Sequence, residues 1–392
     1  MEAFYKTHEY LLTHTDAPVR RNLMDEINWD DRLIGIKGTR GVGKTTFLIQ
    51  YAQEYHQKDR SCLYINMNNF YFQGHSLVDF AEAFVRRGGK TLLVDQVFKI
   101  PGWSEQLRTC YERFPKLKIV FTGSSVMRLK EQNPVLNGIV TPYNLRGFSF
   151  REFLNLRAGT HFPVYSLDDI LHHHEDIVRR ILPTVKPLDY FQDYLHHGFY
   201  PFFLEKRNFA ENLLKTMNMM TEVDILLIQQ IELKYLAKIK KLFYLLAVNG
   251  SSAPNVSSLA KEIDLSRATV MNYIKYLADA RLINLVYRCG DDFPKKPAKV
   301  MLHNPNLAYS IYPAKADEQE ILEIFLVNSL WKDHVVNKGD REGLYIVDNE
   351  HRFRVCVDSL PARVAPGVWY AIRRKEKGHD HAIPLWLFGF LY

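Results

Sequence analysis

The sequence has few cysteines and no long apolar run. Its 392 residues include four cysteines, at positions 62, 110, 289 and 356, and no two of them have the spacing of a C-x-x-C pair. This argues against a zinc site or a disulfide framework and is typical of a reducing compartment. The most apolar runs, residues 242–248 and 384–392, are shorter than the roughly 20 residues of a membrane span. The first twelve residues lack the apolar core of a signal peptide. We therefore expect a cytoplasmic protein without membrane contact.

Positive charge is concentrated in one segment. The formal net charge is +7, and between Lys238 and Lys299 eleven Lys and Arg residues stand against five Asp and Glu residues. Localised positive charge points to nucleic acid or another polyanion more than an evenly spread excess does. The length itself predicts two to four domains.

A glycine-rich loop lies between a β-branched run and a helix-period segment, in the stretch "LIGIKGTRGVGKTTFLIQYAQEY". It matches G-x-x-x-x-G-K-[ST], in which glycines let backbone N–H groups face phosphates, while the lysine reaches the β- and γ-phosphates. The following hydroxyl residue ligates magnesium. The residues predicted to bind ATP are Gly38, Thr39, Arg40, Gly41, Val42, Gly43, Lys44, Thr45 and Thr46.

A second buried run, "TLLVDQ", ends in Asp95, some 50 residues after the loop. Strands alternate with helices, so we expect a parallel sheet whose ligands bind at the carboxyl ends of its strands. Asp95 and Thr45 are the predicted magnesium residues. A third run, "KIVFTGSS", offers Thr122, Ser124 or Ser125 to the γ-phosphate or the attacking water, and Ser124 is our catalytic candidate together with Asp95 and Gln96.

The ordered set "GIKGTRGVGKTT", "LLVDQVFKIPGW", "KIVFTGSS", "LRGFSFREFL" and "HGFYPFF" resembles a group of prokaryotic AAA+ ATPases. The resemblance implies an α/β fold: a parallel P-loop sheet with a helical lid, then a winged helix and a small α/β domain related to restriction endonucleases. The boundaries expected are 1–147 for the ATPase core, 148–235 for the lid, 236–304 for the winged helix and 305–392 for the C-terminal domain.

The chain departs from these relatives beside Asp95. They generally have Asp-Glu-Val-His where this sequence has Asp-Gln-Val-Phe, and an amide cannot accept a proton at neutral pH. A designed Glu-to-Gln trap and a natural loss of hydrolysis both fit, and Phe98 favours natural loss. Many relatives also carry an arginine that serves a neighbouring subunit, whereas residues 130–145 have none. Arg128, Arg146 and Arg151 flank this stretch.

The resulting hypothesis is an AAA+-type protein that binds ATP and Mg²⁺, with hydrolysis weakened because Gln96 replaces a glutamate. Its nucleotide state would be coupled to the winged helix. The alternative is a non-hydrolysing regulatory or scaffold protein in which ATP is a structural ligand. Assembly into a homo-oligomer or with another protein is open.

The third helix of the predicted winged helix is the candidate for DNA contact. It buries Val270, Ile274 and Leu277, and a lysine-bearing wing (Lys295, Lys296 and Lys299) follows it. A role in contact with proteins is the alternative. The residues expected to be exposed toward nucleic acid are Arg267, Thr269, Asn272, Tyr273 and Lys275.

The C-terminal segment begins with a helix expected to be amphipathic, with Ile321, Phe325 and Leu330 on one side. By analogy with nuclease-like relatives, Glu323 stands for a metal-binding helix acid, and Asp348 or Asp358 for a second one. The next strand, "YAIRRKEK", lacks the E-x-K that completes such a site. Metal-dependent cleavage needs paired carboxylates, so we expect this module to be structural or an inactive nuclease fold.

Overall fold

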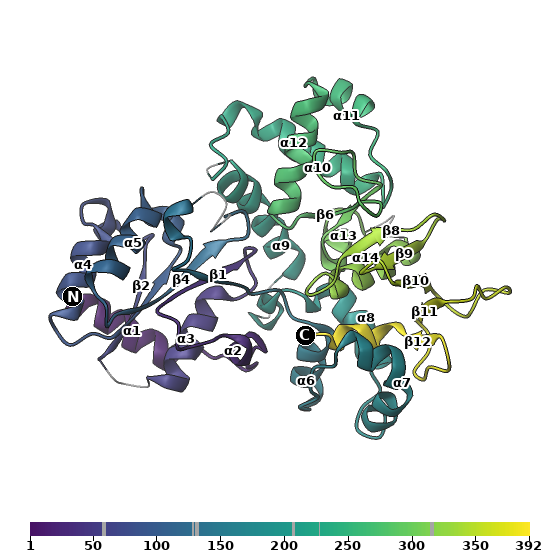
Figure 1. Ribbon diagram of the computed structural model, residues 1–392, viewed down its shortest axis with the longest axis horizontal. Coiled ribbons are helices and arrows are strands. Elements are labelled where there is room, and N and C mark those ends of the chain that lie inside the picture. Colours follow the sequence, from purple (N-terminus) through teal and green to yellow (C-terminus); the bar gives the residue numbers. More distant parts are fainter. Residues whose placement is uncertain (57–59, 128, 130–132, 206–207, 227, 314–316) are drawn as a thin grey trace. The chain divides into compact units, whose positions relative to one another are not determined.

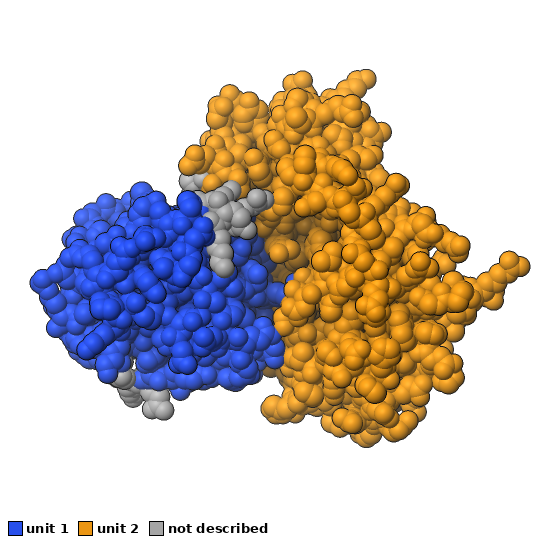
Figure 2. Space-filling view, in the orientation of Figure 1, with its two compact units in different colours: residues 1–146 blue, residues 147–392 orange. Residues whose placement is uncertain are grey.

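The chain divides into two compact units, Met1–Arg146 and Gly147–Tyr392, which Figure 2 colours separately. The structure is a computed structural model that describes residues 1–56, 60–127, 129, 133–205, 208–226, 228–313 and 317–392. The finer boundaries expected within the second unit stay predictions.

The first unit is built on a five-stranded parallel sheet of order β2-β3-β4-β1-β5. Strands β1 to β4 are mostly buried apolar runs, as strands covered on both faces require, whereas the edge strand β5 is only partly buried. Because all five point the same way, the residues that follow β1, β3 and β4 meet at one edge. The strands are β1 (Leu33–Gly38), β2 (Cys62–Asn66), β3 (Thr91–Asp95), β4 (Lys118–Ser124) and β5 (Thr141–Asn144).

Helices cover both faces of this sheet (Figure 1). Helix α1 (Glu2–His14) packs beside α3 (Lys44–Tyr55) on one face, and α4 (Leu77–Val85) packs beside α5 (Trp103–Arg113) on the other. A short helix, α2 (Leu23–Glu26), precedes β1. The layout confirms the predicted parallel α/β sheet of P-loop type.

The second unit starts with helices, as the spacing of its apolar residues predicts. Ser149 and Ser166 begin two of them with capping boxes, in which the serine hydroxyl and an acid three residues later satisfy each other's free N–H groups. The helices are α6 (Phe150–Ala158), α7 (Leu167–Ile181), α8 (Leu188–Asp193) and α9 (Phe209–Met219).

Three helices and a two-stranded antiparallel sheet follow in the predicted order. They are α10 (Leu236–Val248), α11 (Val256–Ile263), α12 (Arg267–Asp279), β6 (Ile283–Val286) and β7 (Lys299–Leu302). Ser266 caps α12, with its hydroxyl accepting the Thr269 N–H at 3.1 Å. The segment between β6 and β7 does not stand free, because the Tyr287 carbonyl accepts the Lys338 N–H at 2.8 Å.

The chain ends in a mixed sheet of order β12-β11-β10-β9-β8. After α13 (Pro305–Ile311), helix α14 (Glu318–Leu330) is buried at every residue from Ile321 to Leu330. The expectation of a one-sided amphipathic helix was wrong, because α14 contacts β10, α13 and the 3-10 segment Leu385–Phe390. The strands are β8 (Val336–Lys338), β9 (Leu344–Val347), β10 (His351–Cys356), β11 (Val368–Ile372) and β12 (Ala382–Pro384).

None of the helices in the described parts of the chain combines the length and the apolar content needed to cross a membrane.

Candidate nucleotide site

The glycine-rich loop joins β1 directly to α3. Gly41 and Gly43 adopt φ angles of 83° and 92°, a region that side-chained residues rarely occupy. A Cβ on Gly38 would lie 2.4 Å from the Leu145 carbonyl oxygen, so only glycine fits there. The Lys44 ammonium donates to the carbonyls of Gly38 and Thr39, each at 2.8 Å, and therefore lies across the loop.

A buried arginine outside the motif braces the loop. Arg21 is 6% exposed, and its guanidinium donates to the Val42 carbonyl at 3.1 Å and to the Arg146 carbonyl at 2.7 Å. One side chain thus connects the middle of the loop to the last residue of the first unit. Nothing in the local sequence distinguishes Arg21 from its neighbour Arg20, which forms ion pairs at the surface.

Asp95 is the hydrogen-bonding centre of the site. It is 1% exposed at the end of β3, and its Oδ2 accepts the Thr45 hydroxyl at 2.7 Å and the Tyr64 hydroxyl at 2.8 Å. Oδ1 accepts the Thr122 hydroxyl, and Asn66 Nδ2 lies 3.4 Å from Oδ2. The loop hydroxyl and the strand carboxylate therefore meet, as the sequence predicts.

Oxygen donors of this kind suit Mg²⁺, which prefers hydroxyl, carboxylate and water ligands. Thr45 is exposed and follows the loop lysine, while Asp95 is buried behind it. The residues present therefore fit a magnesium ion, which Thr45 would hold while Asp95 accepts the Thr45 hydroxyl proton.

Gln96 follows Asp95 at the same edge of the sheet. Its φ of 57° and ψ of 47° place it in the left-handed region, and its N–H donates to Thr122 Oγ1 at 2.9 Å. The side chain is half-buried. Thr122, one of three hydroxyls considered for the γ-phosphate, is thus engaged with Asp95 and Gln96 and holds the β3 end together.

The other predicted nucleotide residues surround this centre. Ser124 is 4% exposed at the end of β4 and lies opposite Gly38 in the strand register. Thr39 is buried, and Arg40 and Thr46 are half-buried. The sequence interpretation missed Tyr64 and Asn66. Strand alternation could have found them, because both lie on one side of β2 and Asn66 pairs with Asp95 in register.

The three arginines that flank residues 130–145 differ in their surroundings. Arg128 lies outside the described residues. Arg146 is half-buried and offers its carbonyl to Arg21. Arg151 is 8% exposed, and its guanidinium donates to the carbonyls of Tyr392 and Phe162 at 3.1 and 3.2 Å. Arg151 therefore binds backbone inside the second unit.

The predicted DNA-facing residues of α12 are not all on its surface. Arg267 and Asn272 are exposed, but Tyr273 is 6% exposed and packs in the core, which corrects its predicted exposure. The cause is its position three residues after Val270 and one before Ile274, on the buried face. Thr269 is half-buried and its hydroxyl contacts Ser266 at 2.8 Å. Lys275 is half-buried and forms an ion pair with Asp279 at 2.5 Å.

Ion pairs neutralise much of the basic segment. At least six of its eleven cations lie within 4 Å of a carboxylate, and four other cations are exposed, in α11, at the start of α12 and in the segment after β6. The paired cations are Lys238, Lys240, Lys241, Lys275, Lys295 and Lys299. The exposed ones are Lys261, Arg267, Arg288 and Lys296.

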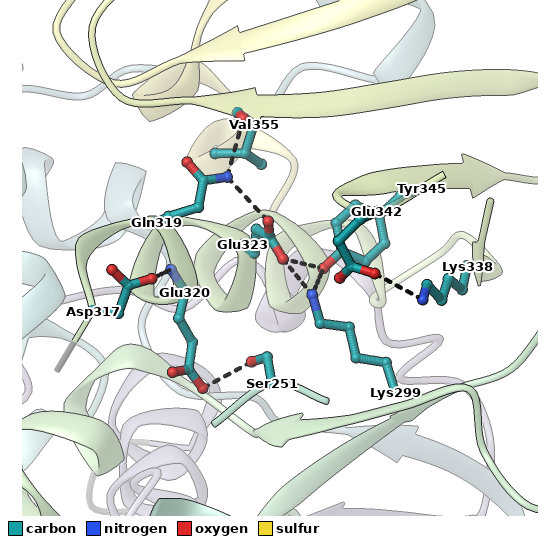
Figure 3. A network of polar contacts seen from close by, with 10 residues as sticks. All are labelled: Ser251, Lys299, Asp317, Gln319, Glu320, Glu323, Lys338, Glu342, Tyr345 and Val355. Carbon is teal, nitrogen blue, oxygen red and sulfur yellow. Dashed lines mark hydrogen bonds and ion pairs between the residues drawn. The ribbon is translucent and has the colours of Figure 1, made fainter. Parts of the chain in front are cut away.

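Lys299, predicted as a wing lysine, is instead a core residue (Figure 3). It is 4% exposed, and its ammonium lies 2.5 Å from Glu323 Oε2 and 3.0 Å from the Tyr345 hydroxyl. The Tyr345 hydroxyl donates to the same Glu323 oxygen at 2.6 Å. Glu323, the candidate metal acid of the C-terminal module, is therefore bound by an ammonium and a phenol.

A cavity of about 690 Å³ opens beside this network. It is lined by Lys299, Glu320, Glu323, Arg354 and Asp358, among others. Ser251 donates to the Glu320 carboxylate at 2.8 Å, and burial raises the pKa of Glu320. The Glu320 and Glu323 carboxylates are thus both engaged by other groups of the protein.

The two other acids considered for that module have partners of their own. Asp348 accepts from His334 at 2.6 Å and from the Val335 N–H at 2.8 Å, and Asp358 pairs with Arg374 at 2.6 Å. Within the described ranges, no three His, Cys, Asp or Glu side chains gather in a way that could hold a metal ion.

Comparison with known proteins agrees with the fold of the first unit. A family model described as an AAA domain matches residues 30–154, and a model for a domain of unknown function, DUF8612, matches residues 188–314.

Two curated relatives come from Methanocaldococcus jannaschii. The uncharacterized protein MJ1637 is 26% identical over 294 residues, which is 70% of this chain and 61% of the relative. The uncharacterized protein MJ1544 is 24% identical over 262 residues, which is 64% of this chain and 55% of the relative.

This chain thus spans a little over half the length of those relatives. Among solved structures, the Aeropyrum pernix Orc1 protein in complex with DNA is similar with a TM-score of 0.31 and 13% identity, over 80% of this chain and 92% of that chain. The parallel sheet, the loop before α3 and the matching family model agree on one assignment. Residues 30–154 contain a nucleotide-binding P-loop fold of AAA+ type.

Proposed function

We propose that this protein binds Mg-ATP at the glycine-rich loop and hydrolyses it slowly, because Gln96 stands where its AAA+ relatives have a glutamate. The observation that carries the proposal is the contact between Thr45 and Asp95, 50 residues apart, beside the loop that Lys44 crosses. Bound nucleotide would replace the loop carbonyls as the partner of the Lys44 ammonium.

The parts of the site divide the work. The loop N–H groups and the positive end of α3 would hold the phosphates. Magnesium, held by Thr45 with support from Asp95, supplies charge neutralisation at the phosphates. Ser124, at the end of β4 next to Gly38, is the proposed γ-phosphate contact.

The weakness lies in activation of water. The Gln96 amide orients a water by hydrogen bonding but takes no proton from it, and loss of a general base typically costs about 10²- to 10⁴-fold in rate. Asp95 does not replace it, since its oxygens already accept from Thr45, Tyr64 and Thr122.

Turnover of radiolabelled ATP by the full chain tests this proposal, with Gln96→Glu as the key variant. We expect wild-type turnover below one per minute and a rise of at least about tenfold in Gln96→Glu. Gln73→Glu, an exposed amide in the same unit, is the matched control and should change nothing. Several turnovers per minute by the wild type would refute the proposal.

If ATP binds but Gln96→Glu also fails to turn over, the protein is better described as a regulatory or scaffold protein with ATP as a structural ligand. Absence of ATP binding by calorimetry would refute both descriptions.

Coupling of nucleotide state to the second unit, and contact between that unit and DNA, remain part of the proposal. DNA contact now rests on Arg267 and Asn272, because Tyr273 is buried and Lys275 is paired. It is therefore the weaker part. The C-terminal module is proposed to be structural, since Lys299 occupies the acid that a metal would need.

A further inference from the structure

The Asp95 carboxylate has nearly all of its acceptor capacity in use. Two carboxylate oxygens offer about four lone-pair sites. On Oδ2, Thr45 and Tyr64 fill both, and Asn66 makes a longer contact at 3.4 Å. On Oδ1, Thr122 fills one. Oδ1 therefore retains about one site, which a water bound to magnesium could use.

Tyr64 is the partner that neither the glycine-rich loop nor the acid motif explains. It lies in the middle of β2, is 4% exposed, and reaches Asp95 from the neighbouring strand. Phenylalanine would fill nearly the same space. A buried hydroxyl is costly unless it is hydrogen-bonded, so the phenol at this position depends on its carboxylate partner.

We propose that Tyr64 is a positioning residue for magnesium, acting through Asp95 to fix which carboxylate lone pair stays open. The inference rests on the proposed function, because it concerns the metal at the same site. By filling Oδ2 together with Thr45, the phenol prevents the carboxylate from turning a second free lone pair toward the ion. It also anchors the acceptor of the Thr45 hydroxyl proton, so that the Thr45 oxygen keeps its own lone pairs for the ion.

The test compares Tyr64→Phe with wild type in the affinity of the full chain for ATP, measured by calorimetry with excess magnesium and again with EDTA. We expect affinity in EDTA to stay within about twofold. The gain in affinity on adding magnesium should fall at least about tenfold, as loss of a hydrogen bond to a charged group predicts. A purely structural role would lower both affinities or the melting temperature and leave the magnesium gain unchanged.

Tyr51→Phe is the matched control, because Tyr51 is 3% exposed in the same unit and its hydroxyl lies 3.4 Å from His56 Nε2. Its magnesium gain should equal that of the wild type. The proposal is overturned if the gain is unchanged or larger in Tyr64→Phe, or if Tyr51→Phe loses it equally. Wild-type protein that binds ATP without any magnesium gain would instead refute the metal part of the proposed function.

Discussion

Gln96 has a positive φ angle, which is unusual for a residue with a side chain. Side-chained residues with positive φ are uncommon and concentrate at functional sites. The strained turn after β3 is held by the Thr122 hydroxyl, which accepts the Gln96 N–H and donates to Asp95. One hydroxyl thus fixes both the Gln96 backbone and the Asp95 carboxylate.

The half-buried carboxyl group of Glu320 is expected to make the stability of the protein depend on pH. Burial raises its pKa, so the folded state binds its proton more tightly than the unfolded state does. The stability that Glu320 contributes through this difference is fully present below its pKa in the unfolded chain. It is lost as pH rises through its pKa in the folded protein. Glu320→Gln keeps an oxygen for the Ser251 hydroxyl and does not titrate. We expect the free energy of unfolding of this variant, relative to wild type, to rise with pH above about 4.5.

Urea unfolding of both proteins at several pH values between 4 and 8 provides the measurement. Glu318→Gln, an exposed neighbour on the same helix, serves as the control. A difference between wild type and Glu320→Gln that stays flat or falls with pH would contradict the expectation.

At the scale of elements, β7 fastens to the C-terminal helix through charge as well as through its partner strand. Lys299 begins β7, and Glu323 lies in the middle of α14. A buried pair of this kind adds little net stability over an apolar pair, but removal of one member leaves an uncompensated charge. The pair therefore constrains how the β6–β7 hairpin lies on α14.

We expect Lys299→Met to lower the free energy of unfolding by about 3–5 kcal/mol, because Glu323 would remain charged in the core. The double variant Lys299→Met/Glu323→Leu should recover much of this loss. Lys296→Met, at an exposed lysine three residues earlier, should stay within about 0.5 kcal/mol of wild type. Denaturant unfolding measures all three, and a double variant no better than the single one would show that the pair is not the cause.

At the scale of the molecule, the residues proposed to bind Mg-ATP all lie in the first of the two units. Ligand binding to the folded state stabilises it by about 2.7 kcal/mol at a hundredfold excess over Kd. We expect Mg-ATP to slow hydrogen exchange in α3 and β3 of the first unit much more than in α14 of the second. Hydrogen–deuterium exchange followed by mass spectrometry measures both regions at once.

Asp95→Asn should lose most of this magnesium-dependent protection, whereas Asp348→Asn, an exposed acid of the second unit, should retain it. Equal protection throughout α14 would mean that nucleotide stabilises the two units as one.

The predictable part of the site consists of contiguous signals. Residues 38–46 can be recognised as a phosphate-binding loop from the sequence, because the motif is defined by the spacing of glycine, lysine and threonine along the chain. Asp95 was found because a buried strand places its last residue at the ligand edge. Arg21 was missed, since it acts through a contact across many residues that no local pattern reports. Tyr64 was missed although strand alternation places it on the same side of β2 as Asn66, which pairs with Asp95 in register.

The charge of the basic segment shows the same division. Its cations are evident in the sequence, but their partners are not, and Lys299 and Lys275 proved to be engaged with acids on α14 and α12. The exposure of Tyr273 was mispredicted because the helix packs over a wider face than the three residues used to define it.

By itself, the sequence determined the order of helices and strands, the parallel sheet of the first unit and the residues of the nucleotide loop. These depend on periodicity and on backbone freedom, which are local properties. Only the tertiary structure decided which side chains meet at Asp95 and which lysines form ion pairs. It also decided that Glu323 is bound by Lys299 and Tyr345. Those outcomes depend on which strands and helices become neighbours, and burial then forces each polar group to find a partner within the protein.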